Sequence, residues 1–218
     1  MNKESLDLKA ERLSGYIDSL PDFQLVAPDV PYGHMGCTIT DAMLQAGLTW
    51  ETVVKPRLDK LRTQCPSAKT TTGFFTLLQT TGPGPLLGWN DLEKPTRILN
   101  VTRFFIEEDI ETEADLKSWL EKDSNVHRLK TLRGIGNKTA DYFRWLAGIP
   151  AVAVDVHLLA FLSLAGISPA NYEEARDVIG GCADLKGLNR TVLDHSIWRY
   201  MSDRSKRRMA CKRSGKLS

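Results

Sequence analysis

Apolar residues recur at helical spacing along almost the whole chain, and this pattern constrains the fold more than any other feature. In the first segment, Leu6, Leu13, Ile17 and Leu20 lie on one side of a helix. Alternating apolar and polar residues, which would indicate half-buried strands, are scarce. The sequence therefore predicts an all-α protein.

Capping signals divide this pattern into helices. Thr112 with Asp115 resembles a capping box, Gly148 is a plausible C-cap, and Asp155 can cap the helix that follows it. A connector is expected over 21–37, and the sequence Gly82-Pro83-Gly84-Pro85 is expected to break the chain. The expected helices cover 5–20, 41–46, a segment from about 50 or 56, 70–80, 95–108, 111–121, 126–132, 137–147, 155–164, 170–179 and 191–201.

Length and charge permit a folded protein with a basic end. The chain has 218 residues, enough for one large or two small globular units, and a formal net charge of +2. Residues 199–218 contain eight Lys or Arg against one acid, Asp203, so this end carries +7 and the rest −5. Such a run attracts phosphate, although a solvated tail is the alternative interpretation. Its basic residues are Arg199, Arg204, Lys206, Arg207, Arg208, Lys212, Arg213 and Lys216.

Cysteine spacing and hydropathy argue against a metal site and a membrane span. Cys37, Cys65, Cys182 and Cys211 are widely separated, with no Cys-x-x-Cys pair, so we expect free thiols and no metal. The apolar run 147–167 is interrupted by Pro150, Asp155 and His157, and it is interpreted as a loop and a buried helix. The N-terminus is polar, and we expect an intracellular protein, in the cytoplasm or nucleoid if it is bacterial.

Two glycines around one apolar residue form the most informative motif. Gly134 and Gly136 allow a tight hairpin with exposed backbone N–H groups, and the helix that follows directs its positive end to the same place. Lys138 lies in the first turn of that helix. These features together favour a phosphate site, although many Gly-x-Gly pairs are simply turns.

The segment Leu132-Arg133-Gly134-Ile135-Gly136-Asn137-Lys138-Thr139-Ala140, followed by Val154-Asp155-Val156-His157, resembles the helix-hairpin-helix motif and catalytic loop of the endonuclease III-like (HhH-GPD) DNA glycosylases. The resemblance is strongest over 126–162. It implies a two-lobed helical fold with a central cleft, in which 38–150 carries the hairpin and 1–37 with 151–218 forms the second lobe. It also implies that Gly134 and Gly136 bind a DNA phosphate, with Arg133, Asn137 and Thr139 as further DNA-binding residues.

The same resemblance implies a mechanism. A lysine with an ordinary pKa of about 10.4 is protonated at neutral pH, and a helix N-terminus and desolvation both favour its neutral form. Neutral Lys138 would attack the sugar carbon that bears a damaged base and form a Schiff base, and strand scission by β-elimination would follow. Asp155 would stabilise the positively charged sugar. The expected protein is a monomeric bifunctional glycosylase and AP lyase that acts on flipped nucleotides in double-stranded DNA.

Two other functions stay open. A monofunctional glycosylase would use Asp155 to activate water, and a non-catalytic helix-hairpin-helix module would only bind DNA. Individually, Lys138 could be a phosphate contact and Asp155 only an N-cap. We expect a structural role for His157, and capping and packing for Asp194 and His195.

Several positions depart from the family pattern. Arg133 stands where many relatives have Pro, and the interval of seventeen residues from Lys138 to Asp155 is one shorter than is typical. The C-terminal cysteine signature of the iron–sulfur cluster is absent, so no iron–sulfur cluster and no other cofactor is expected. Gln45, Tyr142 and Trp198 are candidates for lining the base pocket, with core packing as the alternative for the two aromatic residues. The residue that fills the gap left by a flipped base, the damaged base and the opposite-base preference are not specified.

Overall fold

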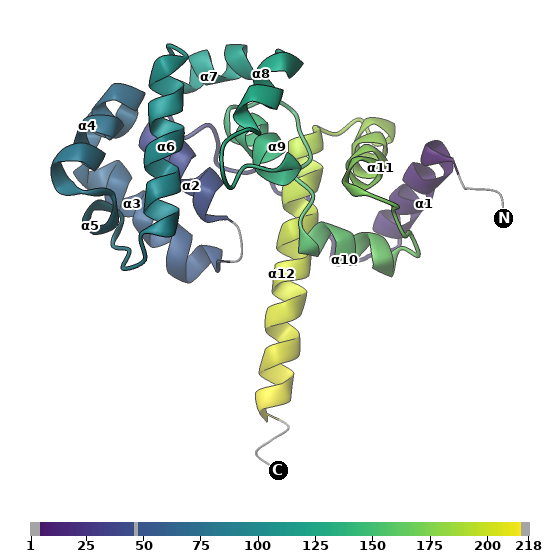
Figure 1. Ribbon diagram of the computed structural model, residues 1–218. Helices are drawn as coiled ribbons and strands as arrows, with labels where there is room; N and C mark the ends of the chain where they lie inside the picture. Colours follow the sequence, from purple (N-terminus) through teal and green to yellow (C-terminus); the bar gives the residue numbers. More distant parts are fainter. Residues whose placement is uncertain (1–4, 46–47, 215–218) are drawn as a thin grey trace. The chain divides into compact units, whose positions relative to one another are not determined.

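The described part of the chain is all-helical, as the sequence predicts (Figure 1). The computed structural model describes the backbone of residues 5–45 and 48–214, and the side chains of these residues as far as 205. Among these residues there is no strand. The elements are α1 (Leu6–Asp18), α2 (Met35–Leu44), the π-helical turn η1 (Trp50–Val54), α3 (Lys55–Gln64), the 3-10 turn η2 (Pro66–Lys69), α4 (Thr71–Thr81), α5 (Pro83–Leu87), α6 (Glu93–Glu107), α7 (Glu113–Leu120), α8 (Asp123–Leu129), α9 (Asn137–Leu146), α10 (Val156–Leu164), α11 (Tyr172–Leu185) and α12 (Arg190–Ser214).

The contacts between residues divide the chain into two compact units. Unit 1 comprises Met1–Pro28 and Pro150–Ser218, and unit 2 comprises Asp29–Ile149. The division expected from the family resemblance lies after residues 37 and 150, whereas the contacts place it after 28 and 149. Unit 1 is therefore built from both ends of the chain and unit 2 from one continuous stretch.

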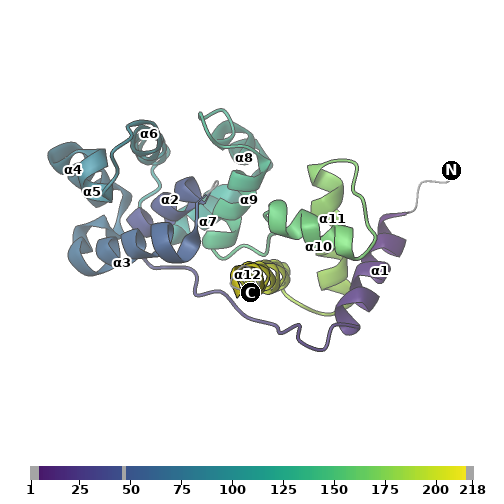
Figure 2. The ribbon, with the colours of Figure 1, turned by 90° about the horizontal axis from the view of Figure 1, so that it is seen from below.

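Unit 1 contains α1, α10, α11 and α12 around one apolar core. The apolar side of α1 packs on α11, and Figure 2 shows the two helices side by side. Lys9, which is buried, pairs with Glu174 at 2.5 Å, and Lys186 pairs with Asp18 at 2.6 Å. Burial of the core supplies most of the driving force for joining the two chain ends. Its buried members include Leu13, Ile17, Leu158, Phe161, Leu162, Ile179 and Ile197.

Unit 2 is organised around α2. All ten residues from Met35 to Leu44 are buried, and this helix contacts α3, α4, α6 and α9. The side chain of His34 caps the helix by accepting a hydrogen bond from the N–H of Cys37. A helix that is covered on all sides can carry a polar side chain only where partners for it are built into the unit.

The structure corrects two of the expected elements. The helix expected at 41–46 begins earlier, at Met35. The sequence does not reveal this start, because a helix buried on every face shows no amphipathic period. The expected break at 82–85 contains α5, in which Pro83 occupies the first turn, where proline is tolerated. Thr112 and Asp115 do form a capping box. No helix in the described ranges is long and apolar enough to cross a membrane.

Candidate active site

The glycine hairpin connects α8 to α9 in unit 2. Ile135 is buried and anchors the turn, and its N–H donates to the carbonyl of Leu132 at 3.1 Å. Gly134 and Gly136 on either side are exposed. Gly136 is the N-cap residue of α9, so no side chain caps this helix. The start of α9 therefore presents its first backbone N–H groups beside an exposed loop.

Glycine suits positions 134 and 136 for different structural reasons. Gly134 has φ +94°, a conformation that other residues rarely adopt. Gly136 has φ −101° and ψ −169°, which is ordinary extended backbone, and a Cβ added there would meet no atom within 4 Å. Only Gly134 therefore needs the conformational freedom of glycine. The exposed backbone of Gly136 is free of side-chain bulk, which is what close approach by a ligand requires.

The other predicted DNA-binding residues lie on the same loop and helix start. Arg133 is 80% exposed in its side chain and pairs with Glu93 at 2.9 Å. Asn137 accepts a hydrogen bond from Nζ of Lys130 at 3.0 Å, and Thr139 is half-buried. Arg133, Asn137 and Thr139 therefore place polar side chains next to the hairpin.

Lys138 is half-buried and lies over an aromatic ring. Its Nζ is 5.1 Å from the ring centroid of Tyr142, four residues further along the same face of α9. Tyr142 in turn stacks on Trp145, with ring centroids 5.1 Å apart. The aromatic face thus defines where the ammonium or amine of Lys138 lies.

Asp41 of α2 lies at the centre of a polar network that also contains Tyr142. Its Oδ2 accepts hydrogen bonds from the hydroxyl groups of Tyr32 at 2.8 Å and Tyr142 at 3.0 Å, and its Oδ1 accepts from Nε2 of Gln45 at 2.9 Å. Gln45 Nε2 also donates to the Tyr142 hydroxyl at 3.0 Å. Burial raises the pKa of Asp41 to about 6, although the three hydrogen bonds and the charge of Lys138 act in the opposite direction.

A second carboxylate, that of Glu113, holds the backbone of Tyr32 in this network. Glu113 accepts hydrogen bonds from the backbone N–H groups of Tyr32 at 3.1 Å and Gly33 at 2.6 Å, and from the hydroxyl of Thr38. These bonds direct the Tyr32 ring towards Asp41, and burial raises the pKa of Tyr32. The structure thus brings together the predicted residues Gln45, Tyr142 and Lys138 with two residues, Asp41 and Tyr32, that the sequence analysis missed.

Asp155 belongs to unit 1 and is the N-cap of α10, as expected. Its Oδ1 accepts hydrogen bonds from the N–H groups of His157 at 2.8 Å and Leu158 at 3.0 Å. Within the ranges that the structure describes, no hydrogen bond to its Oδ2 is found. Half-buried Asp155 therefore keeps one oxygen available while it caps the helix.

The segment before Asp155 is held by α12. The N–H of Ala151 donates to the hydroxyl of Thr191 at 3.1 Å, and the N–H of Ala153 donates to Oδ2 of Asp194 at 2.7 Å. The expectation that Asp194 caps a helix is therefore wrong. The helix α12 begins earlier, at Arg190, and Asn189 accepts a hydrogen bond from the N–H of Thr191 at its start. Both side chains act as acceptors for a buried extended segment that has no neighbouring strand.

Trp198 lies on α12 in unit 1, where its ring contacts two histidines. Its ring stacks on His195 with centroids 5.8 Å apart and makes a T-shaped contact with His157, with centroids 6.4 Å apart. Burial lowers the pKa of His195. Trp198 belongs to unit 1, whereas Gln45 and Tyr142 belong to unit 2.

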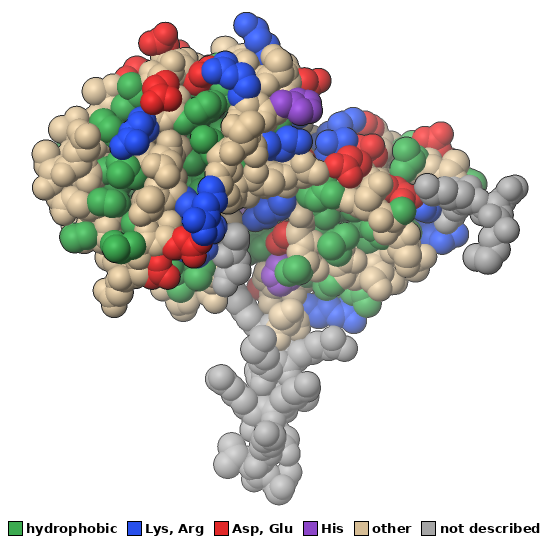
Figure 3. Space-filling view, in the orientation of Figure 1, with side chains coloured by type: hydrophobic (Ala, Val, Ile, Leu, Met, Phe, Trp, Pro, Cys, Tyr) green, Lys and Arg blue, Asp and Glu red, His purple; other side chains and the backbone are tan. Residues whose placement is uncertain are grey.

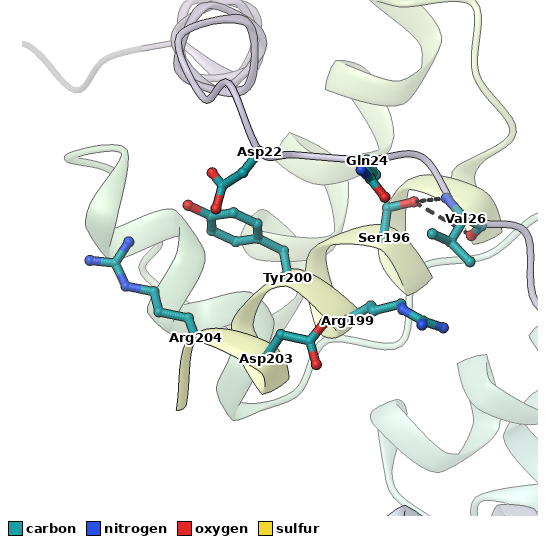
Figure 4. A pocket seen from close by; sticks show the side chains of 8 residues that line it. All are labelled: Asp22, Gln24, Val26, Ser196, Arg199, Tyr200, Asp203 and Arg204. Atoms are coloured by element: carbon teal, nitrogen blue, oxygen red, sulfur yellow. Dashed lines mark hydrogen bonds between the residues drawn. The ribbon is translucent and has the colours of Figure 1, made fainter. Parts of the chain in front are cut away.

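Unit 1 also has a hollow of about 290 Å³ on one side of α12 (Figure 4). Ser196 joins the hollow to the segment after α1 by accepting a hydrogen bond from the N–H of Val26 at 2.9 Å. Two arginines and two aspartates share its walls, so it has no excess of charge. The lining residues are Asp22, Gln24, Val26, Ser196, Arg199, Tyr200, Asp203 and Arg204. The side chains of the basic tail after residue 205 lie outside the described residues.

The described cysteines are free thiols, namely Cys37, Cys65 and Cys182. Burial raises the pKa of Cys37 to about 12 and that of Cys182 to about 11. Cys211 lies outside the residues whose side chains are described. Among those that are described, no group of three His, Cys, Asp or Glu could hold a metal ion.

The chain belongs to a protein family described as Domain of unknown function (DUF8548), which matches residues 89–202, more than half of the chain. This match includes the hairpin, α9 and Asp155, and it ends within α12. No curated protein matches the chain, and no solved structure does.

Proposed function

We propose that this protein is a DNA glycosylase with AP lyase activity, a base-excision repair enzyme of the helix-hairpin-helix superfamily. Its substrate is double-stranded DNA that contains a damaged base or an abasic site. The proposal includes the two-lobed helical fold of that superfamily. The all-helical secondary structure and the hairpin sequence support it.

The surroundings of Lys138 carry the proposal. Its amine lies in the first turn of a helix that follows an exposed glycine hairpin, over a tyrosine that is hydrogen-bonded to a buried carboxylate. A lysine whose only task is to contact phosphate needs no such network beside it. The combination of a backbone phosphate site and a positioned amine suits attack on a sugar carbon.

In the proposed reaction, the neutral amine of Lys138 forms a bond to the anomeric carbon as the bond to the base breaks. The base leaves with the electron pair and takes up the proton that the attacking amine loses. The C1′–O4′ bond of the sugar then breaks as O4′ takes up a proton, which gives the protonated Schiff base. Loss of a C2′ proton from this Schiff base permits β-elimination of the 3′ phosphate. Asp155 supplies negative charge as the sugar becomes positive, through the oxygen that does not cap α10. Asp41 positions Gln45 and Tyr142 and touches neither base nor sugar.

Borohydride trapping tests this function. The wild-type protein should form a covalent adduct with abasic DNA, since borohydride reduces a lysine Schiff base to a stable amine, and Lys138→Gln should form none. Lys130→Gln is the matched control, because Lys130 lies just before the same hairpin and contacts Asn137. It should retain trapping.

The other outcomes identify other functions. Release of a base from a lesion-containing duplex without trapping would replace the lyase by a monofunctional enzyme in which Asp155 activates water. Binding without release from any lesion tested would reduce the protein to a DNA-binding module. Trapping that persists in Lys138→Gln would remove Lys138 from the reaction.

A further inference from the structure

One carboxylate in unit 2 is shared by two arginines from separate segments. Oε1 of Glu93 accepts hydrogen bonds from Nη2 of Arg97 at 2.6 Å and from Nη2 of Arg133 at 2.9 Å. Glu93 and Arg97 form the usual pair four residues apart on a helix, but Arg133 reaches the same oxygen from the hairpin loop, forty residues further along the chain. Two guanidinium groups that converge on one oxygen have the geometry of an oxyanion site.

The hairpin itself fixes Arg97. A Cβ added to Gly134 would lie 3.0 Å from Cδ and 3.0 Å from Nη1 of Arg97, so this side chain runs directly against the backbone of the hairpin. The Nε–H of Arg97 is buried and has no hydrogen-bond partner in the described part of the chain. The hydrogen bond to Glu93 and the contact with the hairpin therefore together hold the guanidinium in place.

The two arginines line a hollow of about 240 Å³ between α6 and the hairpin loop. The wall also holds Arg103, which is exposed and has no ion pair within the described residues, and a single acid, Glu107. Figure 3 shows basic and acidic side chains side by side over the start of α6. The full lining is Arg97, Asn100, Val101, Arg103, Phe104, Glu107, Leu132 and Arg133.

We propose that Arg97 and Arg133 form a binding site for a second backbone phosphate of DNA, and that Glu93 occupies this site in the free protein. A phosphate oxygen takes the place of Glu93 Oε1 when DNA binds. The inference rests on the proposed function for its ligand, but it concerns binding alone. It explains why an arginine occupies position 133 of the hairpin, since a proline there could not reach Glu93.

The consequence is that removal of Glu93 tightens binding. Glu93→Gln frees both guanidinium groups. Glu107→Gln is the matched control, because it removes an equal charge from the wall of the hollow that the two arginines line, without releasing either of them. For an undamaged duplex, measured by fluorescence anisotropy, Glu93→Gln should bind about twofold to fivefold more tightly than Glu107→Gln. Arg133→Gln should bind more weakly than wild type and lower the slope of log affinity against log salt by about one.

Equal affinity of Glu93→Gln and Glu107→Gln, both shown to be folded by their thermal melting, would overturn the inference. So would an unchanged salt slope in Arg133→Gln, or a wild-type protein that does not bind undamaged duplex at low salt. Trapping at Lys138 separates this inference from the proposed function. If trapping persists while these variants fail, only the second phosphate site falls; if the variants behave as expected without trapping, the protein binds DNA here without the proposed chemistry.

Discussion

The two units hold a carboxylate in opposite ways. In unit 2, Asp41 is fully buried and accepts hydrogen bonds from three side chains. In unit 1, half-buried Asp155 accepts from two backbone N–H groups at a helix start and keeps one oxygen free of them. The hydrogen bonds to Asp41 depend on the positions of three other side chains. The backbone N–H groups at a helix start stabilise negative charge without such a dependence on side chains. The first arrangement suits positioning and the second suits a charge that must act on a substrate.

The largest expected effect is on turnover by the proposed glycosylase, and it comes from unit 1. Asp155→Asn keeps an oxygen that can cap α10 but removes the charge, so turnover should fall by about 10² to 10³ while the free energy of unfolding changes little. Single-turnover base release and urea unfolding measure the two quantities. Asp155→Ala is the control, because it also removes the cap and should cost about 1 kcal/mol of stability. Normal turnover in Asp155→Asn would leave this residue with capping alone.

The second effect is a pH dependence of stability that comes from unit 2. Since burial raises the pKa of Asp41 to about 6, the folded state holds this proton more tightly than the unfolded chain does. Its contribution is complete below about pH 4 and is lost as the pH rises to about 6, by a total on the order of 3 kcal/mol.

Asp41→Asn removes this contribution. The difference in unfolding free energy between wild type and variant should therefore shift in favour of the variant between about pH 4 and about pH 6, and then level off. Urea unfolding of both proteins across this range isolates Asp41, because every other group is common to the two. A difference that is independent of pH would mean that Asp41 ionises normally.

The smallest expected effect is the loss of stability on removing one hydrogen-bond donor, the hydroxyl of Tyr32. Tyr32→Phe removes one hydrogen bond from the buried carboxylate of Asp41 and should cost about 1 to 2 kcal/mol of stability at neutral pH. Tyr16→Phe in unit 1 is the counterpart, since the ring of Tyr16 packs on Phe161 and no hydrogen bond from its hydroxyl is found within the described residues. Thermal or urea unfolding should show a much smaller loss for Tyr16→Phe. Equal losses would mean that the hydrogen bond from Tyr32 adds little to the network.

The parts of the fold that local signals determine could be predicted. Ser5 caps α1, Thr112 and Asp115 form their capping box, and Asp155 caps α10, since each signal acts within a few residues of its own position. The start of α2 could not, because complete burial removes the amphipathic pattern that marks a helix. A lone aspartate in the apolar segment Met35–Leu44 was the available signal for Asp41.

The polar network shows why the site itself was predicted only in part. Gln45, Lys138 and Tyr142 were singled out from the hairpin and its resemblance, but their partner Asp41 lies almost a hundred residues before Lys138. The hydroxyl of Tyr32 reaches Asp41 from a segment whose backbone donates a hydrogen bond to Glu113, about eighty residues further along the chain. Such contacts depend on tertiary packing, and spacing along one chain does not reveal them.

The construction of unit 1 from both chain ends has a consequence for synthesis. A ribosome delivers α1 first, but its apolar side packs on α11, and Lys9 finds Glu174 only after another 165 residues have emerged. Unit 2 is one continuous stretch that ends at Ile149, so its own native contacts can begin to form while the rest is still being translated. Until then Ala10, Leu13 and Ile17 lack their native cover. The apolar side of α1 therefore lacks its native partner between translation of α1 and of α11, and a nonsense mutation before α11 would make this loss permanent.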